Sequence, residues 1–418
     1  MNEKQNLRLK RNVGLDYVHT FLSNMNMQSS IWVLYLAYCG LHLAQIGLLE
    51  GIYHATSIVC EIPSGATADL MGRKRCMILS NICIAVSCVI MLFSKSFGWF
   101  AVSFVIQALG NNLNSGSEEA LVYDSMKCLG QEEHYMGVYG RLNVLIEVAQ
   151  GLATVAGGVL AEFSYFWCYA ACVVIAVLAL LPVLWMAEPP QCGEAADTAG
   201  KDAKDASAEG TPAQRTIRET VKHHFAVSAC ILQKDVRIGK IIGFYSVVFA
   251  AHTLLFFYSQ QYFADLGYNK VQISVIMLLV GGASCLGALV SEKMYRWFGK
   301  KCLIPESVII AGAILCYGAG KADVAAAALM CAGFANAALY PIQSDSLNAL
   351  IPSEQRATLI SVDSMCFSIA MIVLFPLAGA LADRWGLKTV LLLLGAILLL
   401  FLLTVFCIEK ESFSSDHS

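Results

Sequence analysis

Long apolar runs separated by short polar stretches dominate this chain, and most runs are long enough to form a helix across a membrane. Such a helix needs about 20 apolar residues to cross the hydrocarbon of a bilayer. The pattern predicts an all-α polytopic membrane protein with twelve transmembrane helices. We expect them over residues 15–38, 45–68, 76–93, 99–122, 136–160, 165–186, 238–262, 270–292, 302–319, 322–344, 357–380 and 389–408.

Composition supports this fold class and excludes several functions. Of the 418 residues, 57% are hydrophobic and 14% are charged, which is too little charge for a water-facing surface. We recognise no nucleophile–base constellation and no phosphate-binding loop, so the sequence indicates neither an enzyme with catalytic residues nor an ATP-driven pump. The 16 cysteines are scattered without repeated CxxC pairs, so we expect small buried side chains and no metal site or cofactor. Nothing indicates a nucleic-acid partner.

Positive residues gather on one side of the predicted spans. If the N-terminus is cytoplasmic, all but five of the 28 Lys and Arg residues fall in cytoplasmic segments, the five being Lys95, Lys270, Lys321, Arg384 and Lys388. Positive residues concentrate on the cytoplasmic side of membrane proteins. We therefore predict a multi-pass protein of the cell (plasma) membrane with both termini in the cytoplasm, where anionic lipid headgroups are partners for the basic residues.

A polar stretch interrupts the pattern between the sixth and seventh spans. Residues 187–213 are rich in Pro, Gly, Ala, Asp and Lys and can bury almost nothing, as expected of a flexible cytoplasmic linker. Ile217, Val221 and Phe225 then follow helical spacing among charges, which favours a helix lying in the membrane interface. The predicted domains are an N-terminal six-helix bundle (1–186), a linker with this interfacial helix (187–237), and a C-terminal six-helix bundle with a short tail (238–418).

The two predicted bundles carry traces of one another. GLHLAQIG at 40–47 matches GYNKVQIS at 267–274, and Gly72 matches Gly299, both at an offset of 227 residues. GVLAE at 158–162 matches GALAD at 379–383 at an offset of 221. Each match is weak alone, but their order along both halves indicates an internal duplication with one deletion of six residues.

A segment rich in charge and glycine joins the second and third spans. In GATADLMGRKR, residues 65–75, Gly65 and Gly72 allow a tight turn, while Asp69 and Arg73 carry opposite charges. The segment resembles the loop signature of the major facilitator superfamily, with Thr67 at the signature's leucine position. Six plus six spans is also that family's architecture. The resemblance implies transport by alternating access, in which two bundles rock about a central site.

Polar residues line single faces of several predicted spans. Glu50, His54, Ser57, Glu61 and Ser64 recur every three or four residues in the second span, and the fourth and fifth spans carry similar stripes. Such stripes face other helices or a water-filled cavity, since they cannot face lipid. Interhelical packing is the alternative role, but intramembrane carboxylates are functional candidates by default. The first-half candidates for binding substrate or protons are Glu50, His54, Glu61, Asn111, Asn114, Glu118, Glu147 and Gln150.

The second half does not repeat these charges. Under the offsets above, Glu118 corresponds to Leu339 and Glu147 to Ser368, which favours a specific task for the first-half carboxylates. The second-half candidates are His252, Asn336, Tyr340 and Gln343. A cavity with one acidic and one aromatic wall suits an amphiphilic cation, and it suits proton coupling equally.

A second group of charges lies at the predicted cytoplasmic ends of the spans. The resemblance implies that Gly65, Asp69, Gly72 and Arg73 belong to an inner gate that holds the bundles together in the outward-facing state. By geometry we add Glu119, Asp124 and Arg141 in the first half, and Asp345 and Arg356 in the second. A structural ion-pair role is the alternative.

These observations predict a secondary transporter for a small-molecule substrate. Residues 61–74 and 115–125 are similar to permeases usually assumed to export drugs. Two features typical of drug–proton antiporters, an arginine in the fourth span and a proline near Thr154, do not occur here. We expect proton-coupled efflux of small amphiphilic or cationic compounds by a monomer. The alternatives are a proton-coupled importer of a small polar nutrient and a membrane sensor that does not transport.

Overall fold

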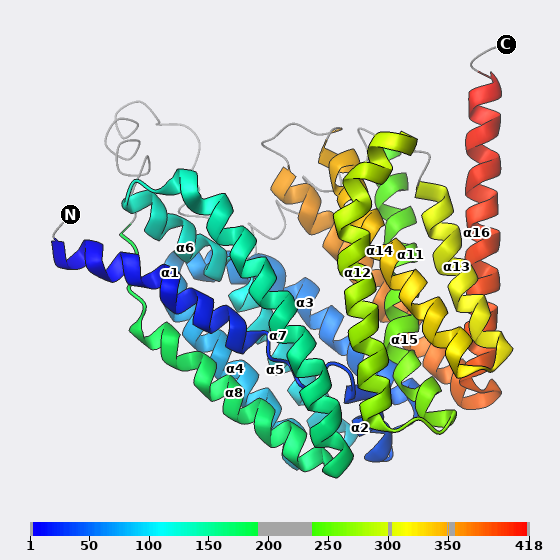
Figure 1. Cartoon of the computed structure of the whole chain (residues 1–418), viewed down its shortest axis with the longest axis horizontal. Coiled ribbons are helices and arrows are strands. Elements are labelled where there is room, and N and C mark those ends of the chain that lie inside the picture. The colour runs from blue at the N-terminus through cyan, green and yellow to red at the C-terminus, as the bar shows by residue number, and fades with distance from the viewer. Residues whose placement is uncertain (1–2, 191–235, 300–302, 349, 351–355, 416–418) are drawn as a thin grey trace. The chain divides into compact units, whose positions relative to one another are not determined.

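The structure, a computed structural model, describes residues 3–190, 236–299, 303–348, 350 and 356–415 (Figure 1). Every regular element in these ranges is a helix. The first part contains α1 (Glu3–Ser23), α2 (Trp32–Tyr38), α3 (Leu43–Met71), α4 (Arg73–Phe93), α5 (Phe97–Asn114), α6 (Ser117–Cys128), η1 (Glu132–His134), α7 (Tyr135–Phe163) and α8 (Tyr165–Trp185). The second contains α11 (Val236–Asp265), α12 (Lys270–Phe298), α13 (Leu303–Cys316), η5 (Tyr317–Ala319), α14 (Ala322–Asn348), α15 (Arg356–Trp385) and α16 (Leu387–Ser415).

The all-α prediction is confirmed, and each predicted span coincides with one helix or with a pair of helices. Among the described residues, eight helices are long and apolar enough to cross a membrane. The predicted span 15–38 is divided, because α1 ends at Ser23 and α2 begins at Trp32. Four of the eight residues in this gap are Asn24, Asn26, Ser29 and Ser30, whose side chains compete with the helix backbone for hydrogen bonds.

The predicted span 99–122 is also divided. Gly116 stands between α5 and α6 with a φ of +75°, a left-handed conformation that glycine adopts without steric cost. The acidic residues Glu118 and Glu119 follow directly in the first turn of α6, where the helix dipole favours negative charge. The division therefore places Glu118 at a helix start rather than within a continuous span.

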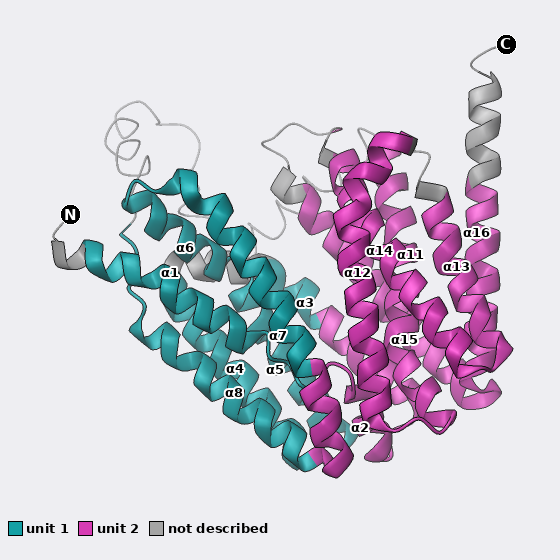
Figure 2. Cartoon of the chain, in the orientation of Figure 1, with its two compact units in different colours: residues 1–27, 56–153, 166–227 teal, residues 28–55, 154–165, 228–418 magenta. Residues whose placement is uncertain are grey.

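The chain forms two compact units (Figure 2). Unit 1 comprises residues 1–27, 56–153 and 166–227, and unit 2 comprises residues 28–55, 154–165 and 228–418. The unit boundaries fall inside α3 and α7, so unit 2 includes two segments from the first half of the sequence. The predicted bundle limits at 1–186 and 238–418 stay a prediction. Most of the predicted linker and its interfacial helix lies outside the described residues.

The sequence repeat corresponds to a repeated local structure. Gly40 and its match Gly267 both have a φ of +89°, and each ends a helix so that a new one can begin. Gln45 then accepts a hydrogen bond from the backbone N–H of His42 at 3.1 Å. Its match Gln272 accepts one from Asn269 at 3.0 Å, within a capping box. The matched residues therefore start α3 and α12 in the same way.

Glycines allow close helix crossings in unit 2. A Cβ on Gly47 of α3 would lie 2.5 Å from the Phe375 carbonyl oxygen of α15. A Cβ on Gly379 of α15 would lie 2.7 Å from the Tyr258 hydroxyl and would overlap the carbonyl of Leu43. Only a residue without a Cβ permits this approach, so α3 and α15 cross at backbone contact distance.

Candidate functional site

Glu118 is the centre of a polar network in unit 1. Its Oε1 accepts a hydrogen bond from Thr20 Oγ1 at 2.7 Å, and its Oε2 accepts one from Asn114 Nδ2 at 2.7 Å. The Nε2 of His19 lies 3.8 Å from Oε1. The predicted neighbours Asn114 and Glu118 are therefore in contact, and α1 supplies further members that the sequence analysis did not select.

The α1 residues in and beside this network are buried. Asp16 is 1% exposed and His19 is 0% exposed. One turn earlier, Asn12 donates to Ser125 Oγ at 2.8 Å and accepts from the Ala187 N–H at 2.9 Å. These residues follow one another at intervals of three or four, the same spacing that identified the other stripes. The predicted first span began at residue 15 and so excluded Asn12, whereas Asp16, His19 and Thr20 lay inside the span with the same spacing and were not among the predicted site residues.

Glu50 and His54 form a second site, in unit 2. The Glu50 carboxylate lies 3.5 Å from His54 Nε2, and both side chains are largely buried. His54 Nδ1 lies 3.2 Å from Ser368 Oγ, and its ring meets the Phe367 ring edge to face at 5.6 Å. The predicted acid–imidazole pair is therefore in contact and extends to α15. A carboxylate, an imidazole and a hydroxyl group in this order can share a proton.

Two carboxylates cap the starts of α3 and α12 in unit 2. Asp383 of α15 accepts hydrogen bonds from the N–H groups of Leu43 at 3.0 Å and Ala44 at 2.9 Å. Glu162 of α7 accepts one from the N–H of Lys270 at 3.0 Å, and it lies 3.8 Å from Lys270 Nζ. Glu162 matches Asp383 in the repeat, and Lys270 matches Leu43. The two caps are therefore equivalent contacts, each joining one half of the sequence to the other.

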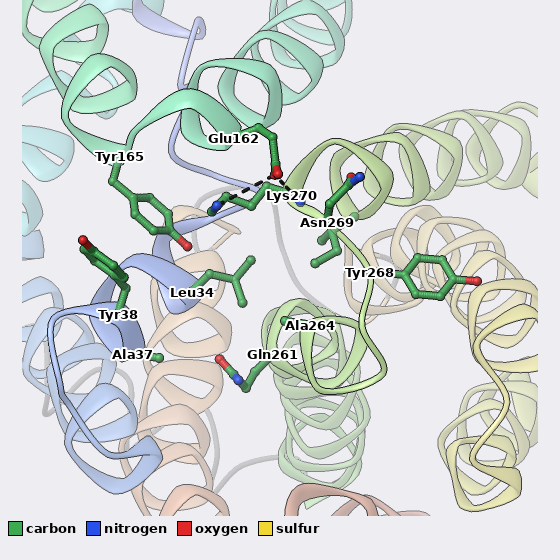
Figure 3. A pocket seen from close by; sticks show the side chains of 11 residues that line it. Leu34, Ala37, Tyr38, Glu162, Tyr165, Gln261, Ala264, Tyr268, Asn269 and Lys270 are labelled. Atoms are coloured by element: carbon green, nitrogen blue, oxygen red, sulfur yellow. Dashed lines mark hydrogen bonds and ion pairs between the residues drawn. The ribbon is translucent and has the colours of Figure 1, made fainter.

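A cavity of about 380 Å³ lies next to the Glu162–Lys270 contact (Figure 3). Tyr38 and Tyr165 form an aromatic wall with ring centroids 5.1 Å apart, and Lys270 Nζ lies 5.0 Å from the Tyr165 centroid. The remaining lining residues are Leu34, Ala37, Gln261, Ala264, Tyr268, Asn269 and Ile273. Aromatic rings, amides and one ion pair around a cavity suit an amphiphilic ligand. This cavity was not predicted from the sequence, because its lining residues come from three separate segments of the chain.

The predicted gate charges of unit 1 are partly in contact. Arg73 Nη1 forms an ion pair with Asp124 Oδ2 at 2.9 Å. Gly72 has a φ of +90°, so the predicted tight turn occurs there, whereas Gly65, also predicted to allow it, lies within α3. Glu188, which was not predicted, accepts hydrogen bonds from the N–H groups of Arg73 at 2.7 Å and Lys74 at 2.9 Å. This carboxylate fills the space that a Cβ on Gly72 would enter.

The other predicted residues have varied surroundings. Gln343 is 1% exposed and donates to Asp363 Oδ1 at 2.9 Å, and Gln150 donates to Asn24 Oδ1 at 3.3 Å. In the described part of the chain, His252 Nε2 and Asn336 Oδ1 are buried without a hydrogen-bond partner. Glu61 is half-buried, Tyr340 is 61% exposed, and the side chains of Asn111, Glu119, Arg141, Asp345 and Glu147 are exposed. The side chains of Gly65, Asp69 and Arg356 lie outside the described residues.

Comparisons with known proteins agree with this fold. The family model described as Major Facilitator Superfamily matches residues 18–320 and 307–416. The uncharacterised MFS-type transporter YxaM of Bacillus subtilis (strain 168) is 23% identical over 384 residues, which is 90% of each chain. Among solved structures, the nucleoside transporter NupG has a TM-score of 0.73 at 14% identity, covering 98% of this chain and 100% of its own. A D-xylose–proton symporter has a TM-score of 0.67 at 14% identity, covering 96% and 97%. The chain therefore belongs to the Major Facilitator Superfamily, a family of membrane transporters.

Proposed function

We propose that this protein is a secondary active transporter that works by alternating access and couples proton entry to the efflux of small amphiphilic or cationic compounds. The observation that carries the proposal is an excess of acids in the first half. Residues 12–72, 96–126 and 142–200 contain no Lys or Arg, yet they include Asp16, Glu50, Glu61, Glu118 and Glu147. Carboxylates in membrane helices are suited to bind protons or organic cations.

The proposed binding residues fall into three groups. Glu50 and His54, in contact with Ser368, are placed to share a proton. Glu147, exposed on α7, is proposed as the carboxylate that exchanges proton for substrate, with Gln150 one turn away on α7 and Glu61 of α3 and Asn111 of α5 as further binding residues. His252, Asn336, Tyr340 and Gln343 are proposed to contribute from the second half. Aromatic side chains there favour a cation through its attraction to the ring face.

The contacts at helix ends support alternating access. We propose that the Asp383 and Glu162 caps close the external side, and that Arg73 and Asp124 belong to the cytoplasmic gate, together with Gly65, Asp69, Gly72, Glu119, Arg141, Asp345 and Arg356. A carboxylate on a helix N-terminus releases when the helices separate, because the backbone N–H groups can then bond to water. Such contacts can open and close without a large free-energy difference.

Proton coupling has support from one structural likeness. The D-xylose–proton symporter shares the fold, and its name gives the proton as the coupled ion. The same likeness keeps import of a polar nutrient as the alternative direction. We further propose a monomer in the cell membrane with both termini in the cytoplasm, as the distribution of Lys and Arg indicates.

The direction of transport can be tested with ethidium as a fluorescent amphiphilic cation. Cells that express the protein should accumulate less ethidium than control cells, and a protonophore should remove the difference. A protein that raises accumulation in a gradient-dependent way would instead be an importer and would contradict efflux. Ligand-induced stabilisation of the purified protein without flux in liposomes, over a panel of cations and polar nutrients, would contradict transport and favour a sensor.

A further inference from the structure

The proposed function does not explain how the buried polar side chains of Asp16 and His19 in α1 are stabilised. Both are almost fully buried; His19 Nε2 lies 3.8 Å from Glu118, and Asp16, about one helical turn before His19, interacts electrostatically with Glu118. In the described part of the chain, both carboxylate oxygens of Asp16 and the Nε2 of His19 have no hydrogen-bond partner. A buried polar atom without a partner costs about 1–3 kcal/mol, and an unpaired charge costs more. A ligand, a buried water or a proton would satisfy these atoms, and only a proton would also remove an unpaired charge on Asp16.

Hydrogen bonding fixes the tautomer of His19. Its Nδ1 lies 3.0 Å from the carbonyl oxygen of Ala179, in α8. A carbonyl only accepts hydrogen bonds, so Nδ1 carries the hydrogen. In the neutral ring Nε2 is then the position without a hydrogen, and it faces Glu118 Oε1 at 3.8 Å. A proton added at Nε2 would produce an imidazolium beside a carboxylate.

Glu118 is held as the acceptor of the cluster. Thr20 donates to one of its oxygens and Asn114 to the other, both at 2.7 Å. Two donated hydrogen bonds stabilise the ionised form of a carboxyl group. Asp16, by contrast, has no donor among the described residues. A hydrogen on its own carboxyl group would leave no buried charge there.

We propose that Asp16 and His19 form a buried proton-binding site in unit 1, with Glu118 as its fixed counter-charge. The proton binds at a carboxyl oxygen of Asp16 or at Nε2 of His19, and Glu118 stays ionised. The other titratable side chains near the cluster are Tyr135 of α7, which interacts electrostatically with Asp16, and the neighbours of Tyr135, which are Glu119, Tyr123 and Tyr139. The inference deepens the proposed proton coupling and rests on it for its role in transport.

Infrared spectroscopy of the full-length protein in lipid tests Asp16. The spectrum should contain the C=O stretch of a buried protonated carboxylic acid, and Asp16→Asn should remove that band. Glu132→Gln, a change at an exposed acid of η1, is the matched control and should leave it. Where Asp16→Asn does not fold, Asp16→Glu should shift the band. A band unchanged in both Asp16 variants would overturn the proposal.

Nitrogen NMR of histidine-labelled protein tests His19, with His19→Gln used to assign its signals. At high pH the spectrum should show the tautomer with hydrogen on Nδ1, and at low pH the doubly protonated ring. A His19 signal that does not change with pH while Asp16 shows no acid band would overturn the site. Stabilisation by sodium ions that Asp16→Asn abolishes, with no acid band, would overturn the proton and identify a metal cation instead.

These readouts do not depend on flux. A titrating His19 and an Asp16 acid band in a protein that moves no substrate would support the site and contradict the proposed transport. Proton-driven efflux by Asp16→Asn and His19→Gln at wild-type rates would overturn the site's coupling role and leave the proposed function standing.

Discussion

Glu162 accepts a hydrogen bond from the backbone N–H of Lys270, and its carboxylate also lies 3.8 Å from the Lys270 ammonium group. The equivalent acid in the other half, Asp383, caps the equivalent helix start at Leu43. The duplication therefore produced two contacts in which an acid from each half binds a helix of the other half. Each contact combines a hydrogen bond with the attraction between a carboxylate and the positive end of a helix.

Removal of either cap should destabilise the protein by a similar amount. Replacing a side chain that caps a helix start by Ala costs about 1 kcal/mol. We expect Glu162→Ala and Asp383→Ala each to lower the thermal unfolding temperature in detergent, whereas Asp383→Asn should lower it less because it keeps an acceptor. Arg384→Ala changes the exposed neighbour of Asp383 and is the control. An equal loss in the control would contradict a specific capping role.

A methyl group added at Gly158 should separate α7 from α12, and one added at its match Gly379 should separate α15 from α3. A Cβ on Gly158 would lie 2.9 Å from the Lys270 carbonyl and would overlap Ser274 Oγ, while a Cβ on Gly379 would overlap the Leu43 carbonyl. Overpacking typically costs about 1–3 kcal/mol. We expect Gly158→Ala and Gly379→Ala to lower thermal stability by that order. Gly281→Ala meets nothing within 4 Å and should not. Wild-type stability of both crossing variants would show that the helices do not approach this closely.

The Arg73–Asp124 contact offers a test by charge exchange. Its atoms are 2.9 Å apart, but the side chains are 29% and 31% exposed, so the pair should contribute less than about 1 kcal/mol to stability. We expect Arg73→Asp and Asp124→Arg each to reduce transport several-fold with little change in unfolding temperature. The double variant should recover part of the activity. No recovery in a folded double variant would argue against a gating ion pair.

Glu147→Gln should abolish proton-driven flux while folded protein stays in the membrane, because the amide cannot bind and release a proton. Ethidium accumulation in cells and size-exclusion profiles of the purified variant measure the two properties. Glu132→Gln, at an exposed acid outside the proposed binding residues, should transport normally. Normal pH-dependent transport by Glu147→Gln would defeat this assignment.

The sequence allowed the helices and part of the site to be predicted, because both depend on local spacing. The match of Gln45 with Gln272 has a physical cause, since both residues accept a hydrogen bond from the residue three positions earlier at a helix start. Glu50 and His54 met as predicted because one helical turn separates them. Hydropathy alone placed α1 too late and thereby excluded Asn12 from the predicted span.

Contacts between distant segments were not predictable in this way. The hydrogen bonds of Glu188 to Arg73 and Lys74 join residues more than 100 positions apart, and no periodicity relates them. The cavity beside Lys270 likewise needs three segments to be brought together. Without covarying positions, a single sequence holds no signal for such pairs. The division at Gly116 was readable in principle, because glycine followed by two acids is typical of a helix start.

Glu188 also connects the predicted linker to the turn between α3 and α4. It lies at the start of the predicted linker (187–237) and accepts hydrogen bonds from the first turn of α4. A force on this linker that reaches Glu188 acts on its two hydrogen bonds to the N–H groups of Arg73 and Lys74, which lie within the loop signature itself. A ligand or a covalent modification on the chain just beyond Glu188 therefore acts on the α3–α4 turn through this contact. Such a ligand would slow transport without contacting the binding residues.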